Sequence, residues 1–202
     1  MTRRVVVALL APVAWSPPGI DPADWRHALA EDVVDLLATL QEVETAVAVT
    51  PADRSLADAV VWPGTPVVEV PAPTVDAVLA ALDGYDQAAV IAADAPDLPG
   101  LTVGKLLRPL TTRPVAVAPA EGTGPGLLGL AARLPAPAWL PAVDLDTALP
   151  TAIRAAAPRP ADLAVTAAWR RVRGPADFAT LDPAVEGWEA TRALLATGHL
   201  SV

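Results

Sequence analysis

The sequence contains no cysteine, which excludes a disulfide framework, a thiolate zinc site and a cysteine nucleophile. Lysine is almost absent, because Lys105 is the only one among 14 basic residues, and the formal net charge is −9. Nucleic-acid binding depends on neutralising phosphates, so a chain this acidic is not expected to bind DNA or RNA. Its apolar runs are also shorter than the roughly 18 uninterrupted residues of a membrane span, so no membrane partner is expected.

Aromatic side chains are scarce, with one Phe, one Tyr and six Trp in 202 residues. Hydrophobic residues still make up 53% of the chain, and many are Ala and Val, so the core must be built from small side chains. The 23 prolines predict frequent turns and short elements. No internal repeat or low-complexity linker divides the chain, so we expect a single domain over residues 1–202.

The first apolar run, residues 5–11, is continuous and rich in valine, which is typical of a strand buried on both faces. The run is similar to the apolar part of a signal peptide, but it is short and Pro12 interrupts it. We therefore expect a cytoplasmic protein with a buried first strand. Asp21 and Pro22 then have the residue types of a helix N-cap and of the first helical position.

Strands and helices are predicted to alternate through the first 120 residues. The expected strands are apolar segments separated by helical patterns, at residues 45–50, 67–70, 88–93 and 114–118. This order gives right-handed βαβ crossovers and a mostly parallel sheet, which defines an α/β fold. Ligands of such sheets bind outside the carboxyl ends of the strands, so residues just after a strand are the candidate site residues.

The second half of the chain is less regular. Residues 127–134 are predicted as a strand after a glycine-rich turn, and residues 163–172 have a β-like pattern. Residues 147–156 are predicted as a helix with Asp146 as its N-cap. The triplet Asp144-Leu145-Asp146 also has a form seen in metal sites, but the helical run that follows favours the cap.

The segment Asp94-Ala95-Pro96-Asp97 lies where the predicted strand 88–93 ends. Two carboxylates at the carboxyl end of a strand are well placed for a hard cation such as Mg²⁺, which prefers oxygen ligands and phosphate partners. The alternative is structural, because Asp94 can make a turn and Asp97 can help to start the next helix.

A second candidate is the loop that runs from Glu121 to Gly126 after the predicted strand 114–118. Its glycines, Gly122 and Gly124 among them, would let backbone amides approach a phosphate or a sugar closely. The loop is not a P-loop, because no Gly-Lys-Ser/Thr follows. A wide hairpin turn is the alternative interpretation.

The only basic cluster is formed by Arg170, Arg171 and Arg173. Guanidinium groups match phosphates and carboxylates with paired hydrogen bonds, so the cluster could hold one small phosphorylated ligand. Ordinary surface charge is the alternative, since exposed arginines are common.

Three segments together resemble the glycosyltransferase-A fold, and most of all a bacterial family of glycosyltransferase-like proteins related to molybdenum-cofactor and phospholactate guanylyltransferases. Ala92-Ala93-Asp94-Ala95-Pro96-Asp97-Leu98 is similar to that family's Gly-Ser-Asp-Ser-Pro-Asp-Leu strand end. The segment from Ala118 to Leu130 is similar to its Gly-Pro-Ala-Glu-Asp-Gly-Gly-Tyr-Tyr-Leu-Ile-Gly-Leu, and the segment from Arg171 to Phe178 to its Asp-Val-Asp-Thr-Pro-Glu-Asp-Leu. Order and spacing match over most of the chain.

The resemblance implies a three-layer α/β sandwich with a mostly parallel mixed sheet. It implies a nucleotide or nucleotide sugar over the strand ends, Mg²⁺ bridging its phosphates, and a small phosphorylated or hydroxylated acceptor. The implied catalytic residues are Asp94, as a metal or ribose ligand, and Glu121, in contact with the acceptor. The expected nucleotide- and anion-binding residues are Asp97, Gly122, Gly124, Arg171 and Arg173.

The sequence departs from the family at the metal site, because Arg171 and Arg173 stand where the family carries acidic ligands. Residues 12–19, after the first strand, also lack the family's basic residue for a triphosphate. Two hypotheses follow. Either the arginines replace the metal and bind the anion directly, or the chain is an impaired relative that acts as a binding or protein-interaction module. The six tryptophans are compatible with the second hypothesis, because Trp is enriched among the residues that anchor protein interfaces. The sequence is also compatible with a homodimer.

Overall fold

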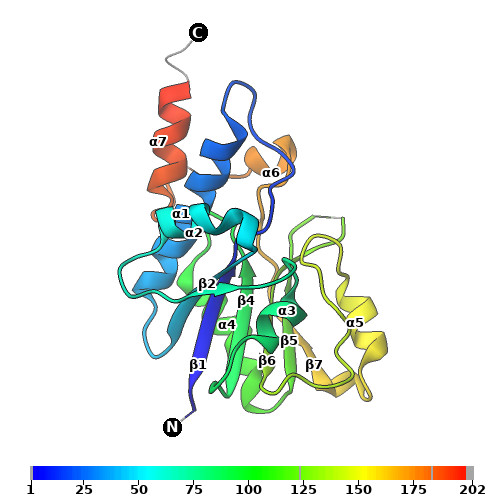
Figure 1. The fold of residues 1–202 in the computed structure, drawn as a ribbon. Helices are drawn as coiled ribbons and strands as arrows, with labels where there is room; N and C mark the ends of the chain where they lie inside the picture. The colour runs from blue at the N-terminus through cyan, green and yellow to red at the C-terminus, as the bar shows by residue number, and fades with distance from the viewer. Residues whose placement is uncertain (1, 123, 183, 199–202) are drawn as a thin grey trace.

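A computed structural model describes residues 2–122, 124–182 and 184–198. Its described part contains a seven-stranded sheet in the order β3-β2-β1-β4-β6-β5-β7 (Figure 1). β6 runs antiparallel to its neighbours β4 and β5, and the other neighbouring strands are parallel. The strands are β1 (Arg4–Leu9), β2 (Glu44–Val49), β3 (Val67–Glu69), β4 (Gln87–Ala92), β5 (Val115–Pro119), β6 (Leu127–Arg133) and β7 (Leu163–Val165).

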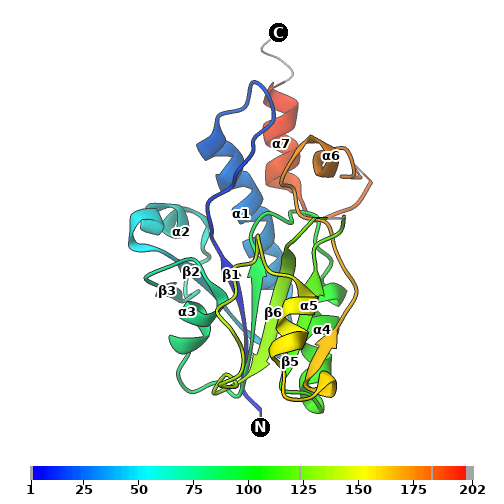
Figure 2. The same ribbon diagram turned by 90° about the vertical axis from the view of Figure 1, so that its right-hand side faces the viewer.

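Helices cover both faces of the sheet, and α6 and α7 lie beyond its carboxyl end next to α1 (Figures 1 and 2). Short 3₁₀ turns at Pro51–Asp53, Arg108–Thr111 and Pro160–Asp162 adjoin other elements. The helices are α1 (Pro22–Thr39), α2 (Arg54–Val60), α3 (Val75–Ala80), α4 (Gly100–Leu107), α5 (Pro150–Ala156), α6 (Pro175–Phe178) and α7 (Glu189–Gly198).

Two hydrophobic cores lie on opposite faces of the sheet because alternate side chains of a strand point in opposite directions. Val6 and Ala8 of β1 pack with α1, α2 and α4, whereas Val5, Val7 and Leu9 pack with α3 and α5. All five of these side chains are buried. The expected three-layer sandwich with a mixed, mostly parallel sheet is therefore confirmed.

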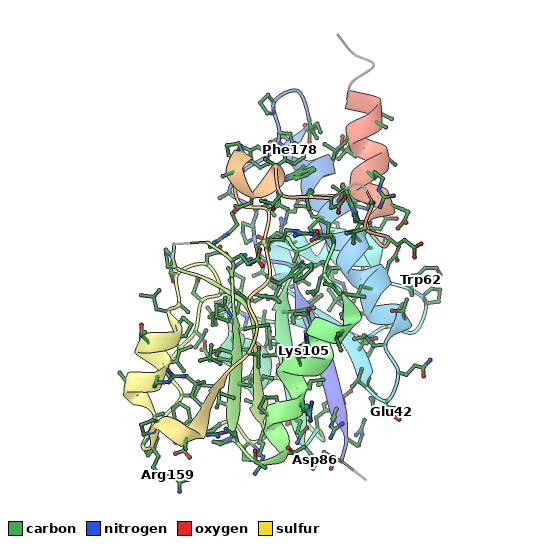
Figure 3. The ribbon with its side chains drawn as sticks, turned by 180° about the vertical axis from the view of Figure 1, so that it is seen from behind. Glu42, Trp62, Asp86, Lys105, Arg159 and Phe178 are labelled. Atoms are coloured by element: carbon green, nitrogen blue, oxygen red, sulfur yellow. The ribbon has the colours of Figure 1, made fainter. Side chains whose placement is uncertain are left out.

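A third, smaller cluster lies beyond the strand ends, where α1, α6 and the loop after β1 meet. Trp25 of α1 is fully buried, with ring centroids 6.1 Å from Trp15 and 6.2 Å from Phe178. Figure 3 shows Phe178 on α6 beside the first turns of α1. Aromatic packing therefore attaches the loop after β1 to the closing part of the chain.

The start of α1 is as predicted, because the Asp21 side chain accepts hydrogen bonds from the backbone of Ala23 (2.8 Å) and Asp24 (3.4 Å). A second cap joins distant parts of the chain. Asp32 of α1 accepts hydrogen bonds from the backbone N–H groups of Ala190 and Thr191, both at 2.9 Å, in the first turn of α7. Burial raises the pKa of Asp32 to about 6, although these hydrogen bonds act in the opposite direction.

The prediction that Asp146 caps a helix from residue 147 is wrong. The helix begins at Pro150, and Asp144 closes the preceding turn by accepting hydrogen bonds from the backbone of Asp146 (2.7 Å) and Thr147 (3.1 Å). The β-like segment 163–172 pairs regularly only as far as Val165, and Trp169 adds an isolated bridge to Ala120. No helix in the described ranges is long and apolar enough to cross a membrane.

Candidate functional site

A cavity of about 270 Å³ opens at the carboxyl ends of β1 and β4. Residues 9–13 form one wall, residues 92–94 follow β4, and residues 144–146 come from the segment before α5. Arg26 of α1 and Arg171 complete the polar lining. The cavity therefore lies where a parallel α/β sheet is expected to hold a ligand, with one largely apolar wall and a group of charged side chains.

Arg171 and Asp94 form a buried ion pair in this cavity. The guanidinium donates from Nε to Asp94 Oδ1 at 2.6 Å and from Nη2 to Asp94 Oδ2 at 2.8 Å. The two side chains are only 4% and 8% exposed. Two hydrogen bonds between the same two groups fix the relative orientation of the guanidinium and carboxylate planes, and they turn the Asp94 carboxylate toward the arginine.

The remaining Arg171 donors are also used within the protein. Nη2 contacts Asp146 Oδ1 at 2.5 Å, and Nη1 donates to the carbonyl oxygens of Leu127 (3.1 Å) and Leu145 (2.8 Å). Since a guanidinium has five N–H groups, all five have an acceptor. Burial alone would lower the pKa of Arg171, but the charges and hydrogen bonds of Asp94 and Asp146 outweigh burial and raise it above its ordinary value.

The residues present do not fit the Mg²⁺ that the fold resemblance implies. Both oxygens of Asp94 accept hydrogen bonds from Arg171, which lies between Asp94 and Asp146. A dication beside this guanidinium would be repelled by several kcal/mol at an effective dielectric near 20. Among the described residues, no group of three or more His, Cys, Asp or Glu side chains is arranged to hold a metal ion.

Arg26 also lines the cavity and ties α1 to its surroundings. It donates from Nη1 to Asp53 Oδ1 at 2.7 Å and from Nη2 to the carbonyl oxygen of Leu10 at 2.9 Å. The hydrogen bond from Arg26 lowers the pKa of Asp53 below its ordinary value. The Arg26 Nε–H is buried and has no acceptor in the described part of the chain.

Asp97 does not line the cavity and has partners of its own. Its fully buried carboxylate accepts hydrogen bonds from Arg170 Nε (2.5 Å) and from the Trp169 indole Nε1 (3.2 Å). The Arg170 guanidinium also lies 4.8 Å from the centroid of the Trp169 ring. Two consecutive arginines thus pair with the two aspartates that the sequence places after β4.

The other predicted residues lie outside the cavity. Glu121, Gly122 and Gly124 are exposed on the loop between β5 and β6. Gly122 has φ +106°, a conformation that favours glycine in a turn. Arg173 donates from Nη1 to the carbonyl oxygen of Pro125 at 2.7 Å, so it braces this loop.

The structure therefore brings Asp94 and Arg171 together and leaves Asp97, Glu121, Gly122, Gly124 and Arg173 apart from them. Sequence reasoning missed Arg26 as a lining residue and treated Asp146 as a cap. For Asp146 the sequence did carry a signal, because it belongs to an Asp-x-Asp triplet. No local pattern distinguishes Arg26 from other arginines of a helix.

Comparison with solved structures finds the same fold over nearly the whole chain. A protein of Desulfovibrio desulfuricans G20 assigned to the nucleotide-diphospho-sugar transferases has a TM-score of 0.65 at 17% identity, over 99% of this chain and 98% of that one. The 4-diphosphocytidyl-2C-methyl-D-erythritol synthase of Anaerococcus prevotii has a TM-score of 0.61 at 9% identity, covering 96% of each chain.

A CMP:2-keto-3-deoxy-manno-octonic acid synthetase, solved in complex with CTP, has a TM-score of 0.54 at 16% identity, over 97% of this chain and 98% of that one. No protein-family model matches the sequence, and no curated protein matches it either. At these identities the similarity establishes the fold, which is the expected nucleotide-diphospho-sugar transferase type, and leaves the function to the chemistry of the site.

Proposed function

We propose that this chain is a nucleotidyltransferase- or glycosyltransferase-like protein that binds a nucleotide or nucleotide sugar in the cavity at the carboxyl ends of β1 and β4. The observation that carries the proposal is the cavity itself, which combines an apolar wall at residues 9–13 with carboxylates at Asp94, Asp144 and Asp146. Its volume of about 270 Å³ is just below the roughly 300–1,000 Å³ of typical small-molecule pockets, which suits the nucleoside part of a ligand better than a whole nucleotide sugar.

The polar groups at the cavity suit a ligand rich in hydroxyl groups. Asp144 and Asp146 each use Oδ1 for contacts within the protein, and Oδ2 of each has no hydrogen-bond donor among the described residues. These oxygens are available to ribose or sugar hydroxyls, while the base packs against the apolar wall.

The charge of the site predicts which ligands bind best. Asp94, Asp146 and Arg171 together carry one net negative charge, since two carboxylates face one guanidinium. A triphosphate brings further negative charge without a metal to neutralise it, so electrostatic repulsion disfavours it. A nucleoside monophosphate or a nucleotide sugar is therefore expected to bind more tightly than the corresponding triphosphate.

A second candidate function is that of an impaired relative that acts as a binding or protein-interaction module. The observation that favours it is the complete use of Arg171 within the protein, because no donor of this guanidinium is left to stabilise charge in a reaction. In this second candidate function the protein has the same fold and cavity but catalyses no reaction.

Isothermal calorimetry and thermal shift with a panel of nucleosides, nucleoside mono-, di- and triphosphates and nucleotide sugars test the proposal. Each compound is measured with MgCl₂ and with EDTA. We expect one class to raise the melting temperature by mass action, to a similar extent in both conditions. Failure of every compound to bind would favour the second candidate, and binding that requires Mg²⁺ would contradict the metal-free site.

A pair of variants locates the binding site. Ala93 lines the cavity and makes no side-chain hydrogen bond, so Ala93→Leu should narrow the cavity without leaving a charge unpaired. Ala155→Leu adds the same volume on the exposed face of α5 and serves as the control. Binding should weaken at least tenfold in the first variant and stay unchanged in the second.

A further inference from the structure

The Arg171 guanidinium is enclosed by five oxygen atoms. They are both carboxylate oxygens of Asp94, Oδ1 of Asp146, and the carbonyl oxygens of Leu127 and Leu145, at 2.5 to 3.1 Å from its nitrogens. We refer to these five acceptors as the oxygen cage. The Arg171 side chain at its centre is only 4% exposed and Asp94 is 8% exposed, whereas Asp146 closes the solvent side with a half-exposed side chain.

The oxygen cage comes from three separate segments of the chain. Asp94 follows β4, Leu127 begins β6, and Leu145 and Asp146 precede α5. The backbone of Val172, next to Arg171, also donates to the carbonyl oxygen of Asp94 at 2.7 Å. The guanidinium therefore holds together the segments that form the polar side of the cavity.

We propose that the oxygen cage is a cation site that the chain fills from within, with the Arg171 guanidinium as its resident cation. Two carboxylates give the cage a formal charge of −2, and the remaining acceptors are neutral carbonyl oxygens. Hard dications prefer oxygen donors of these two kinds, and a planar guanidinium matches paired carboxylates. Removing the Arg171 side chain leaves a cage that takes free guanidinium or a dication from solution, whereas the intact protein has no need of either.

The neighbouring pair of Arg170 and Asp97 provides a matched comparison. Asp97 is as deeply buried as Asp94, but besides Arg170 it has a neutral donor, the Trp169 indole. In the described part of the structure, Arg170 contacts one carboxylate and no carbonyl oxygen. Loss of Arg170 therefore leaves one carboxylate that keeps a donor, not an oxygen cage.

The test compares Arg171→Ala with Arg170→Ala by thermal unfolding, without any nucleotide, in buffers with added NaCl, guanidinium chloride or CaCl₂ at equal low-millimolar concentration. Arg171→Ala should lower the melting temperature by about 10 °C, because the Asp94 carboxylate loses its counter-charge. Guanidinium or Ca²⁺ should restore at least half of that loss, and NaCl should not. Arg170→Ala and the wild-type protein should respond equally to all three salts.

A second variant separates a cation site from general salt effects. Asp94→Asn together with Arg171→Ala halves the charge of the cage, so its melting temperature should not respond to either cation. If Arg171→Ala does not fold in NaCl, refolding in guanidinium chloride or CaCl₂ replaces the melting experiment, and recovery of folded protein in these salts alone supports the proposal. Equal responses of Arg171→Ala and Arg170→Ala, or no recovery in any salt, would overturn it. Because no nucleotide is present, the result is independent of the proposed nucleotide binding.

Discussion

The carboxylate of Asp94 accepts two hydrogen bonds from one edge of the Arg171 guanidinium, at 2.6 Å from Nε and 2.8 Å from Nη2, although 77 positions separate the two residues in the chain. Because both side chains are buried, neither charge is solvated when its partner is removed. The pair is therefore a structural element of the site. A substitution of either residue alone is expected to destabilise the fold, so its effect on ligand binding cannot be separated from its effect on stability.

Asp94→Ala should lower the free energy of unfolding by about 3–5 kcal/mol, because it leaves the Arg171 guanidinium buried beside a single carboxylate. Asp94→Leu combined with Arg171→Met removes both charges and should be about 2 kcal/mol more stable than Asp94→Ala, since well-packed apolar residues can replace a buried pair. Urea unfolding of the two variants and the wild-type protein measures the difference. Equal stability of the two variants would mean that removing Asp94 leaves no energetic penalty on the Arg171 charge.

Gly129 on β6 has no room for a side chain. A Cβ there would lie 2.7 Å from the carbonyl oxygen of Val90 and 3.0 Å from Cγ2 of Ile91, both on β4. Gly129→Ala should therefore destabilise the protein by about 1–3 kcal/mol through overpacking. Gly104→Ala on α4 is the control, because nothing lies within 4 Å of its Cβ, and it should stabilise by roughly 0.5–1 kcal/mol. Urea unfolding gives the shift of each denaturation midpoint from that of the wild-type protein, and shifts in the same direction for the two variants would contradict this account.

The elements that the sequence predicted well depend on local patterns. The expected strands at residues 5–11 and 88–93 correspond to β1 (Arg4–Leu9) and β4 (Gln87–Ala92), because continuous apolar runs identify strands buried on both faces. The helix expected after Asp21 begins at Pro22, because N-cap chemistry is also local. Such signals were sufficient to predict the α/β sheet and the edge of the sheet where a site would lie.

The contacts within the site could not be predicted in the same way. Asp94 and Arg171 were both candidates, but their pairing depends on the path of residues 166–172, which no local pattern specifies. Asp146 precedes an apolar helical run, and an aspartate there has the same local pattern whether it caps a helix or receives an arginine. The roles expected for Glu121, Gly122 and Gly124, and anion binding by Arg173, stay predictions.

Phe178→Ala should cost about 2 kcal/mol of stability, because the half-buried ring packs against Trp15 and Trp25 with centroids 5.8 and 6.2 Å away. Loss of this contact also frees the loop after β1, which carries Trp15. Leu101→Ala is the control, since Leu101 is 69% exposed and its truncation should change stability by less than about 0.5 kcal/mol. Urea unfolding followed by tryptophan fluorescence measures both, and equal losses would contradict the packing role of Phe178.

The pH dependence of stability should carry a contribution from Asp32. Its pKa of about 6 in the folded protein lies above the ordinary value near 3.9, so the folded state binds the proton more tightly than the unfolded state does. This contribution is therefore fully favourable below about pH 4 and is lost as the pH rises toward and through 6. A difference of about two pKa units corresponds to roughly 3 kcal/mol.

Comparison with Asp32→Asn isolates this contribution, because asparagine is of similar size and does not titrate. Asparagine meets the N–H groups of Ala190 and Thr191 with only one oxygen, so the variant also loses a constant amount of stability that does not depend on pH. Urea unfolding at several pH values between 4 and 7.5 gives the difference in unfolding free energy between the two proteins. We expect that difference to move in favour of Asp32→Asn by roughly 2 kcal/mol across the range, since part of the effect is already lost at pH 4. A constant difference would mean that the two backbone N–H groups at the start of α7 compensate for burial, and that Asp32 is charged throughout.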